Sequence, residues 1–444
     1  MHLPSLFSPR HAAACTFLAA LSPLATAQNA GQWTEFRTHV DQSGRNGFGD
    51  RCLSIGDINA DGSADYLVAA SAHRDANQIE IGKVYLYSGT DGSLIREYLG
   101  SNNGSRMGFD MAAMGDINSD GVPDYVIAEP DGFMSAGLNF GWVHMYSGAD
   151  GSVIHTWTGS ETDTKFGEQV ENVGDWDGDG VNDLAIGEPF FNSDALRCGR
   201  VQVFSGVTGL ELISIQGPEE HSNFGVRIYG PGDINNDGSV DLMVQRRLTG
   251  TDILKSMVDV YSGRTEKRIA TLRSPRHHAY PSNSFGHGMI ALDDWNGDGF
   301  QEIAISDFTA GLGGLESRGL IWIYDGRTGL VVKTIAGHAE QRWLGHPLVG
   351  LGDVDGDGFR DFAAGQLGHE NHLIANGAVA FFSGGTGQLM DRLQGQIHHG
   401  RFGFCIGDAT DLNGDGRAEV LIGVPGMGTV NSAPSELQIW SWSP

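Results

Sequence analysis

The chain has 444 residues, with 55 acidic against 28 basic side chains and a formal net charge of −27. This acidity argues against nucleic acid as a partner, because nucleic-acid-binding proteins need basic patches. No run beyond the N-terminus reaches the roughly 18 apolar residues of a membrane helix. Length alone would suggest about three domains, but internal repeats override that estimate.

The first predicted element is a secretory signal peptide over residues 1–27. Arg10 and His11 precede an apolar stretch over 12–24, and small residues at 25–27 follow it before Gln28. A charged start, an apolar centre and a small-residue cleavage site are typical of such signals. We expect cleavage after Ala27 and a soluble product, either secreted or located at the cell surface.

Residues 33–40 are the next predicted element, a strand, and a set of repeats follows it. An acidic loop recurs seven times at intervals of 58–61 residues, with starts at Asp57, Asp116, Asp175, Asp233, Asp294, Asp353 and Asp411. A fixed period that carries one punctuated motif indicates a repeat architecture rather than several unrelated domains.

Each loop places oxygen-bearing side chains at positions 1, 3, 5 and 9 and Gly at position 6. A hard cation such as Ca²⁺ takes six to eight oxygen ligands, which a tight loop can supply at one point. The sequence therefore predicts up to seven Ca²⁺ sites. The predicted ligands are Asp57, Asn59, Asp61, Asp65, Asp116, Asn118, Asp120, Asp124, Asp175, Asp177, Asp179, Asp183, Asp233, Asn235, Asp237, Asp241, Asp294, Asn296, Asp298, Glu302, Asp353, Asp355, Asp357, Asp361, Asp411, Asn413, Asp415 and Glu419.

Charge distinguishes the loops from one another. Loops three and six carry four carboxylates each, whereas the other loops have Asn at position 3. Because affinity rises with ligand charge in similar geometries, loops three and six should bind Ca²⁺ most tightly. Loss of Arg10 with the signal changes the net charge from −27 to −28, and seven Ca²⁺ would halve it to −14.

Two other interpretations account for part of this loop pattern. An EF-hand loop also begins D-x-[DN]-x-[DN]-G, but it needs a bidentate Glu at position 12, where this chain has apolar residues such as Val68, Ile127 and Ile186. A metal-free Asp/Asn/Gly turn suits any single copy, although it accounts less well for seven copies with one ligand spacing. Short apolar runs follow the loops, so each loop should join two strands.

The rest of the repeat predicts a β-propeller. A Phe-Gly pair or its variant opens each repeat near residues 48, 107, 166, 224, 285, 344 and 402. Four antiparallel strands per repeat make one blade. Only three strands of the seventh repeat are present before the end at Pro444. We therefore expect residues 33–40 to complete the last blade, with Trp33 and Phe36 covering its apolar side, so that 28–444 is an all-β, seven-bladed propeller.

At this point the repeat resembles the FG-GAP repeat of the integrin α-subunit propeller. Blade three carries the pattern best, in Phe166-Gly167, the loop 175–183, Ala185-Ile186-Gly187-Glu188-Pro189 and the Ser205-Gly206 turn. The resemblance implies a calcium-binding propeller with an adhesion role. The sequence departs from the family in having the loop in all seven repeats and Val244-Gln245-Arg246 in place of Gly-x-Pro. It also has no leg domains, membrane span or cytoplasmic tail, so we expect a free-standing secreted relative.

Variable connections point to a ligand face. The calcium loops and the third-to-fourth-strand turns should share one face, and the other two kinds of connection should share the opposite face. Variable loops on a rigid scaffold commonly bind ligands, and their aromatic and Arg content suits a protein or glycan. We expect a monomer. The candidates are Phe133, Phe190, Phe191, Arg246, Arg247, His338, Trp343, His369, His372 and His398.

A secreted carbohydrate-active enzyme, either a lyase or a hydrolase, is the alternative function. His-rich connections around His369, His372 and His398 could act as acid and base or bind a transition metal, but isolated surface histidines are commoner. No Gly-x-Ser-x-Gly, His-Glu-x-x-His or phosphate loop is present. A binding module is therefore favoured, and no catalytic residue is predicted.

Three cysteines remain after the signal, and they do not make a disulfide framework. Cys52 and Cys405 fall on the innermost strands of neighbouring blades. Their offsets from the Phe-Gly pairs differ by one residue, so they are expected to point to opposite faces. Buried free thiols at Cys52, Cys198 and Cys405 are the favoured prediction.

Overall fold

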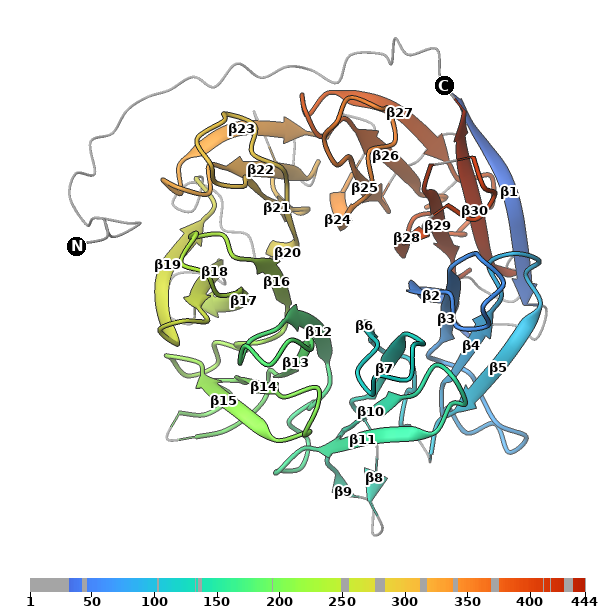
Figure 1. The fold of residues 1–444 in the computed structure, drawn as a ribbon, viewed down its shortest axis with the longest axis horizontal. Coiled ribbons are helices and arrows are strands. Elements are labelled where there is room, and N and C mark those ends of the chain that lie inside the picture. The colour runs from blue at the N-terminus through green and yellow to red at the C-terminus, as the bar shows by residue number, and fades with distance from the viewer. Residues whose placement is uncertain are drawn as a thin grey trace.

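The computed structural model describes residues 32–443, except 42–45, 102–103, 132, 135–137, 194, 249–254, 276–283, 312–317, 338–341, 369–374, 410, 416 and 427–433. Seven four-stranded antiparallel sheets are arranged in a ring (Figure 1). The predicted seven-bladed β-propeller is therefore confirmed. The predicted signal peptide lies outside the described residues.

The first strand of each blade is innermost and the fourth is outermost. Blades one to three consist of β2 (Phe48–Gly56), β3 (Asp65–Ala70), β4 (Lys83–Tyr87) and β5 (Leu94–Leu99); β6 (Met111–Gly115), β7 (Asp124–Glu129), β10 (Trp142–Tyr146) and β11 (Val153–Thr158); and β12 (Gln169–Gly174), β13 (Asp183–Glu188), β14 (Arg200–Phe204) and β15 (Glu211–Gln216). A small hairpin of β8 (Phe133–Met134) and β9 (Leu138–Asn139) extends from blade two.

The remaining blades repeat this order. Blades four to six consist of β16 (Ile228–Gly232), β17 (Asp241–Leu248), β18 (Lys255–Ser262) and β19 (Lys267–Arg273); β20 (Phe285–Ala291), β21 (Ile303–Asp307), β22 (Leu320–Tyr324) and β23 (Val331–Ala336); and β24 (Leu344–Gly350), β25 (Phe362–Gln366), β26 (Ala378–Phe382) and β27 (Leu389–Gln394). Blade seven consists of β28 (Ile406–Ala409), β29 (Glu419–Val424), β30 (Ser435–Ser443) and the N-terminal strand β1 (Gln32–Asp41).

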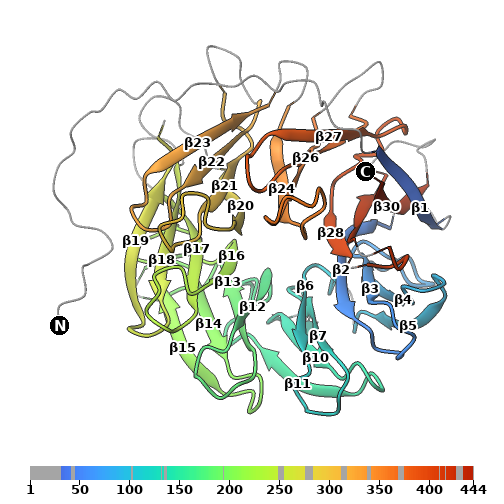
Figure 2. The same cartoon turned by 45° about the horizontal axis from the view of Figure 1, so that its top comes forward.

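The N-terminal strand closes the ring, as the sequence predicted. β1 pairs antiparallel with β30, with Trp33 opposite Trp442 and Val40 opposite Glu436 (Figures 1 and 2). Trp33 is 3% exposed and stacks on Phe381 of blade six at 4.2 Å between ring centroids. β1 therefore covers the edge of β30 and also packs against the preceding blade.

The prediction for Phe36 is wrong. The register of β1 shifts between Glu35 and Arg37, so Phe36 is the extra residue of a β-bulge. At a bulge, one extra residue interrupts the alternation of side chains between the two faces of the strand. Phe36 is 37% exposed, and the Arg37 guanidinium lies 5.0 Å from the centre of its ring. Trp33, rather than Phe36, covers the apolar side of blade seven.

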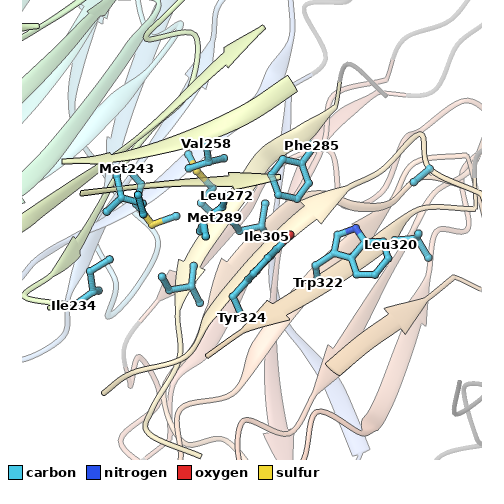
Figure 3. Packing of buried hydrophobic residues seen from close by; sticks show 14 residues of the cluster. Ile234, Met243, Val258, Leu272, Phe285, Met289, Ile305, Leu320, Trp322 and Tyr324 are labelled. Atoms are coloured by element: carbon cyan, nitrogen blue, oxygen red, sulfur yellow. The ribbon is translucent and has the colours of Figure 1, made fainter. Parts of the chain in front are cut away.

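The hydrophobic core is divided among the boundaries between blades. The described buried residues form seven clusters, and each cluster draws its members from two neighbouring blades. Figure 3 shows the cluster between blades four and five, in which Met243 and Val258 face Met289 and Tyr324. Burial of apolar area is the main contribution to stability. Because each cluster spans two blades, no blade has a complete core without its neighbour.

The glycine of each Phe-Gly pair fits tightly against a neighbouring blade. Gly108 has φ +82°, and a Cβ atom at this position would lie 2.5 Å from Val84 Cγ2 and 2.8 Å from Ala69 Cβ, both in blade one. Only glycine adopts this backbone conformation readily and also leaves room for the contact. The recurring Phe-Gly pair is thus explained by the packing of one blade on the next.

Across the described ranges, the structure offers no helix with the length and apolar character needed to cross a membrane.

Candidate cation loops and variable face

Each acidic loop joins the innermost strand of a blade to its second strand, and its own side chains hold its shape. In loop one the carboxylate of Asp57 accepts the backbone N–H groups of Asp61 at 3.1 Å and Gly62 at 2.9 Å. Gly62, at position 6, has φ +96°, a conformation that glycine adopts readily. The hydrogen bonds accepted by the position-1 carboxylate therefore stabilise the turn on which the other candidate ligands lie.

Three loops bring three carboxylates together. These are Asp175, Asp177 and Asp183 in loop three; Asp353, Asp355 and Asp357 in loop six; and Asp411, Asp415 and Glu419 in loop seven, and the chosen oxygens of each group lie within 4.8 Å of one another. Two ligands on opposite sides of Ca²⁺, each about 2.4 Å from the ion, are separated by about the same distance. The donor type and the spacing fit a calcium ion, and loops three and six are the two loops with four carboxylates each. Loop seven joins them although position 3 is Asn413.

The position-9 carboxylate has a second role that the sequence analysis missed. Asp65 is fully buried and accepts the Ile58 N–H at 2.9 Å on one oxygen and the Gly89 N–H at 2.9 Å on the other. The bond from position 2 of the loop recurs in all seven blades. The position-9 side chain thus connects the loop, through hydrogen bonds, to the turn between the third and fourth strands.

Burial also changes the protonation of this carboxylate. It raises the pKa of Asp183 to about 6 and that of Asp361 to about 7, and neighbouring carboxylates in the same loops add to the effect. Buried acids with raised pKa values lack a compensating positive charge. A bound cation would supply that charge.

The Ser-Gly pair that recurs in the turns of blades one to four and six is explained by these contacts. The Ser88 hydroxyl donates to Asp61, at loop position 5, at 2.9 Å, and Ser262 donates to Asp237 at 2.8 Å. The following glycine donates its N–H to position 9. A signal for this network was present in the sequence, because Ser-Gly follows the loop at a nearly constant distance.

These contacts place the loops and the third-to-fourth-strand turns on one face of the ring. The other connections therefore lie on the opposite face, here called the variable face. Trp343 is 39% exposed, with φ +66°, directly before β24. His398 is exposed in the connection from β27, and its ring centroid lies 5.2 Å from that of His399. Both side chains are accessible to a ligand.

Two other candidates for the ligand face are buried and contact residues of their own blade instead. Phe191 is buried beneath the guanidinium of Arg200, 3.8 Å from its ring centroid. Arg246 is 4% exposed, and its Nε donates to Asp259 at 2.6 Å. Neither side chain is presented to solvent. Phe190 and Arg247 are half-buried, and the side chains of Phe133, His338, His369 and His372 lie outside the description.

The prediction that Cys52 and Cys405 point to opposite faces is wrong. Both are buried in the cluster between blades one and seven, and their Sγ atoms are 2.8 Å apart. The register of β2 shifts between Phe48 and Arg51, which interrupts the alternation on which the prediction depended. Cys52, Cys198 and Cys405 are free and buried, as expected.

Comparison with known proteins supports the resemblance. A family model described as an FG-GAP-like repeat matches residues 57–127. Integrin alpha-5 of Xenopus laevis is 30% identical over 210 residues, which is 43% of this chain and 19% of that protein. Integrin alpha-V of Gallus gallus is 27% identical over 238 residues (51% and 22%), and integrin alpha-8 of Mus musculus is 32% identical over 178 residues (37% and 16%).

The chain spans about a fifth of the length of these relatives. The fold is a seven-bladed propeller, and its repeat is similar to the FG-GAP repeat and to integrin α subunits.

Proposed function

We propose that this protein is a secreted or cell-surface calcium-binding propeller that binds a protein or glycan ligand through its variable face. The observation that carries the proposal is the convergence of three carboxylates in each of loops three, six and seven of a propeller similar to integrin α subunits. In this view Ca²⁺ neutralises the loops and holds the two inner strands of each blade in position. The ligand is bound on the opposite face.

Two features support a role in binding rather than structure alone. Trp343 is a large aromatic side chain that is 39% exposed on the variable face, and aromatic residues are enriched among the residues that dominate binding energy. The inner strands and the seven interblade clusters provide a rigid scaffold for such loops. The adhesion role is proposed from the similarity to integrin α subunits.

The proposal is tested by probing arrays of glycans and extracellular proteins with the purified protein, in calcium and in EGTA. We expect specific binding that requires calcium and is reduced in Trp343→Ala. Leu210→Ala is the matched control, because Leu210 is 68% exposed in a turn on the calcium-loop face. No calcium-dependent ligand, or equal binding by both variants, would contradict the proposal.

The enzyme alternative is addressed by the same arrays. Two of the His-rich positions on which it depended, His369 and His372, lie outside the described residues. Release of cleaved glycan by the wild type, lost on His398→Ala, would favour an enzyme over a binding module.

A further inference from the structure

Two of the acidic loops contain an Asn-Gly pair at positions 3 and 4. The chain has five such pairs, namely Asn46-Gly47, Asn103-Gly104, Asn296-Gly297, Asn376-Gly377 and Asn413-Gly414. The Asn residues of loops five and seven, Asn296 and Asn413, are exposed, whereas Asn46 and Asn376 are buried. Asn103 lies outside the described residues. Within the described ranges, the exposed Asn-Gly pairs therefore lie only in the acidic loops.

An Asn-Gly pair can convert itself into an acidic residue. The backbone nitrogen of Gly bonds to the side-chain carbonyl carbon of Asn, the bond from that carbon to the amide nitrogen breaks, and ammonia leaves. Glycine favours this step because it has no side chain to hinder the attack. Water then opens the cyclic imide at one of its two carbonyl groups, which gives aspartate or isoaspartate. In either product the loop gains one negative charge.

Loop five holds the reacting groups in hydrogen bonds. The Gly297 N–H donates to Asp294 at 2.7 Å. Nδ2 of Asn296 donates to Glu302 at 2.9 Å, and its Oδ1 accepts the Asp298 N–H at 2.9 Å. A backbone nitrogen that donates to a carboxylate keeps its proton, so it does not act as a nucleophile. The loop must therefore open before the reaction can begin.

Loop seven restrains its pair in the same way. The Gly414 N–H donates to Asp411 at 2.6 Å. Nδ2 of Asn413 donates to Glu419 at 2.6 Å and to the Ser441 hydroxyl of β30 at 2.9 Å. Asp411 and Glu419 are two of the three convergent carboxylates of this loop. The groups that restrain the Asn-Gly pair are thus candidate ligands, and a cation bound by them would stabilise the closed loop.

The aspartate product has a counterpart in another loop. Loop three has Asp177-Gly178 at the same two positions, with φ +82° at Gly178 and a bond of 2.7 Å from its N–H to Asp175. Gly297 has φ +74° and makes the equivalent bond at the same distance. Because the two loops share this geometry, aspartate at position 3 fits the loop and adds a carboxylate ligand.

Isoaspartate has the opposite effect, because the main chain then passes through the former side chain and is longer by one carbon atom. In loop seven this extra atom lies between Asp411 on one side and Asp415 and Glu419 on the other. The oxygens of these three carboxylates lie within 4.8 Å of one another. Since their convergence depends on the length of the chain between them, the isoaspartate loop should bind Ca²⁺ more weakly.

We propose that Asn296 and Asn413 are deamidation sites that are protected while Ca²⁺ occupies loops five and seven, and that react after the ion is lost. This inference rests on the proposed function, because calcium is what keeps the loops closed. Loss of calcium then produces a covalent change that the return of calcium does not reverse. The fraction of isoaspartate in the two loops increases with the time that a molecule has spent without calcium.

The test incubates the full chain in mildly alkaline buffer made with ¹⁸O-labelled water, in excess calcium and in excess EGTA. Peptide mass spectrometry measures deamidation at intervals, and the label distinguishes it from deamidation during digestion. We expect Asn296 and Asn413 to react in EGTA. Calcium at a hundredfold excess over its dissociation constant should slow both reactions by about a hundredfold, because open loops become rarer by that factor.

The buried pairs serve as internal controls. Asn46 is 5% exposed and Asn376 is fully buried, so both should remain amides with and without calcium. Deamidation of Asn46 and Asn376 in EGTA at the rate of Asn296 would mean that the whole ring opens, and it would overturn the assignment to the loops.

A matched variant separates the chemistry from the shape of the loop. Gly297→Ala reproduces the Asn59-Ala60 pair of loop one, in which Ala60 has φ +60°. A Cβ atom at Gly297 would meet no other atom within 4 Å. The variant should therefore bind calcium like the wild type. It should lose most of the deamidation at Asn296, because a methyl group lies next to the attacking nitrogen, while Asn413 reacts as before.

Two results would overturn the inference and leave the proposed function intact. One is the absence of deamidation at Asn296 and Asn413 in EGTA, during a period in which a synthetic peptide of residues 291–301 reacts. The other is an equal rate with and without calcium in a protein that binds calcium by calorimetry. An equal rate in a protein that binds no calcium would instead refute the proposed function and, with it, the protective role of the ion.

Discussion

The Sγ atom of Cys52 lies 2.8 Å from the Sγ atom of Cys405, across the boundary where the first blade meets the last. The two residues are 353 positions apart in the chain. The hydrogen-bonded strands β1 and β30 close the ring at the outside of blade seven, and this thiol pair lies at the inner side of the next boundary. Burial, and then the hydrogen bond with Cys405, raises the pKa of the Cys52 thiol.

We predict that glutathione disulfide joins Cys52 and Cys405. Two thiols lose two protons and two electrons, and one glutathione disulfide becomes two glutathione molecules. The reaction should be slow at neutral pH because the thiolate is the reactive form. The product should be more stable by roughly 2–4 kcal/mol, since the cross-link restricts the unfolded chain. Peptide mass spectrometry without reduction and the melting temperature measure both effects.

Cysteine variants provide the controls for this prediction. Cys198→Ser should oxidise like the wild type, whereas Cys52→Ser should form no intramolecular cross-link. Three titratable thiols after prolonged exposure to the oxidant at alkaline pH would show that the pair cannot be closed.

Removal of calcium is predicted to lower the melting temperature strongly. Carboxylates that converge without a cation repel one another, and each ligand that binds only the folded state adds about 2.7 kcal/mol at a hundredfold excess over its dissociation constant. Calorimetry in excess calcium and in excess EGTA measures the difference. An identical melting curve in both, together with no metal by mass spectrometry of the purified protein, would exclude the calcium assignment.

The loops are predicted to differ in affinity. Asp177→Asn removes one of the three convergent carboxylates of loop three, so it should eliminate the tightest class of site or weaken it towards the others. Asn118→Asp in loop two is the reverse change, and it should strengthen a weak site. Calcium titration of the two variants measures the ranking. Seven equivalent sites in the wild type would mean that blade geometry, rather than ligand charge, determines affinity.

Closure of the ring can be tested with two aromatic residues of the same strand. Trp33→Ala removes a side chain that is 3% exposed and stacked on Phe381, and it should cost about 3–5 kcal/mol. Phe36→Ala should cost less than about 1 kcal/mol, because that ring is at the surface. Denaturant unfolding measures both. A chain that begins at Gly44 should aggregate, since the edge of β30 is left unpaired; a stable monomer of that length would show that β1 is dispensable.

The pH dependence of stability should include a contribution from His39 of β1. Its Nε2 lies 2.7 Å from the Tyr66 hydroxyl oxygen, and its ring stacks on Tyr87 at 4.2 Å. Burial, and then the charge of Arg37, lowers its pKa from 6.5 to about 4. The unfolded chain therefore binds the proton more readily, so stability is lost as the pH falls from about 6.5 towards 4.

His39→Gln should consequently lose less stability than the wild type over this pH range, at saturating calcium. His398→Gln, an exposed site on the variable face, serves as the control. Parallel melting-temperature profiles for the wild type and His39→Gln would contradict the assignment.

The sequence predicted the ring because its signals are periodic. The loops and the Phe-Gly pairs recur at fixed intervals, and the last repeat lacks its own fourth strand. The structure contains the seven blades and the closure by β1 that these signals indicate. Local exceptions to the alternation of side chains between the two faces of a strand were not predictable from the sequence. The bulge at Phe36 and the register shift before Cys52 each reverse the direction of side chains, and neither has a distinctive sequence signal.

Side-chain partners in the sites were also invisible to the sequence. The similar-looking residues Arg246 and Arg247 differ because Asp259 of β18 lies beside the first alone. The hydrogen bond from Asn413 to Ser441 joins loop seven to β30 across 28 residues of sequence. Such contacts depend on how the ring folds, whereas the loop ligands are close together in the chain.

The pairing of β1 with β30 also determines when the ring can close during synthesis. β1 is synthesised before the other described strands and its partner after them, and about 400 residues separate the two. At about 5–20 residues per second, β1 waits for tens of seconds before β30 exists. During that time β1 lacks its native partner, so the newly made chain must keep β1 from pairing elsewhere until β30 has emerged.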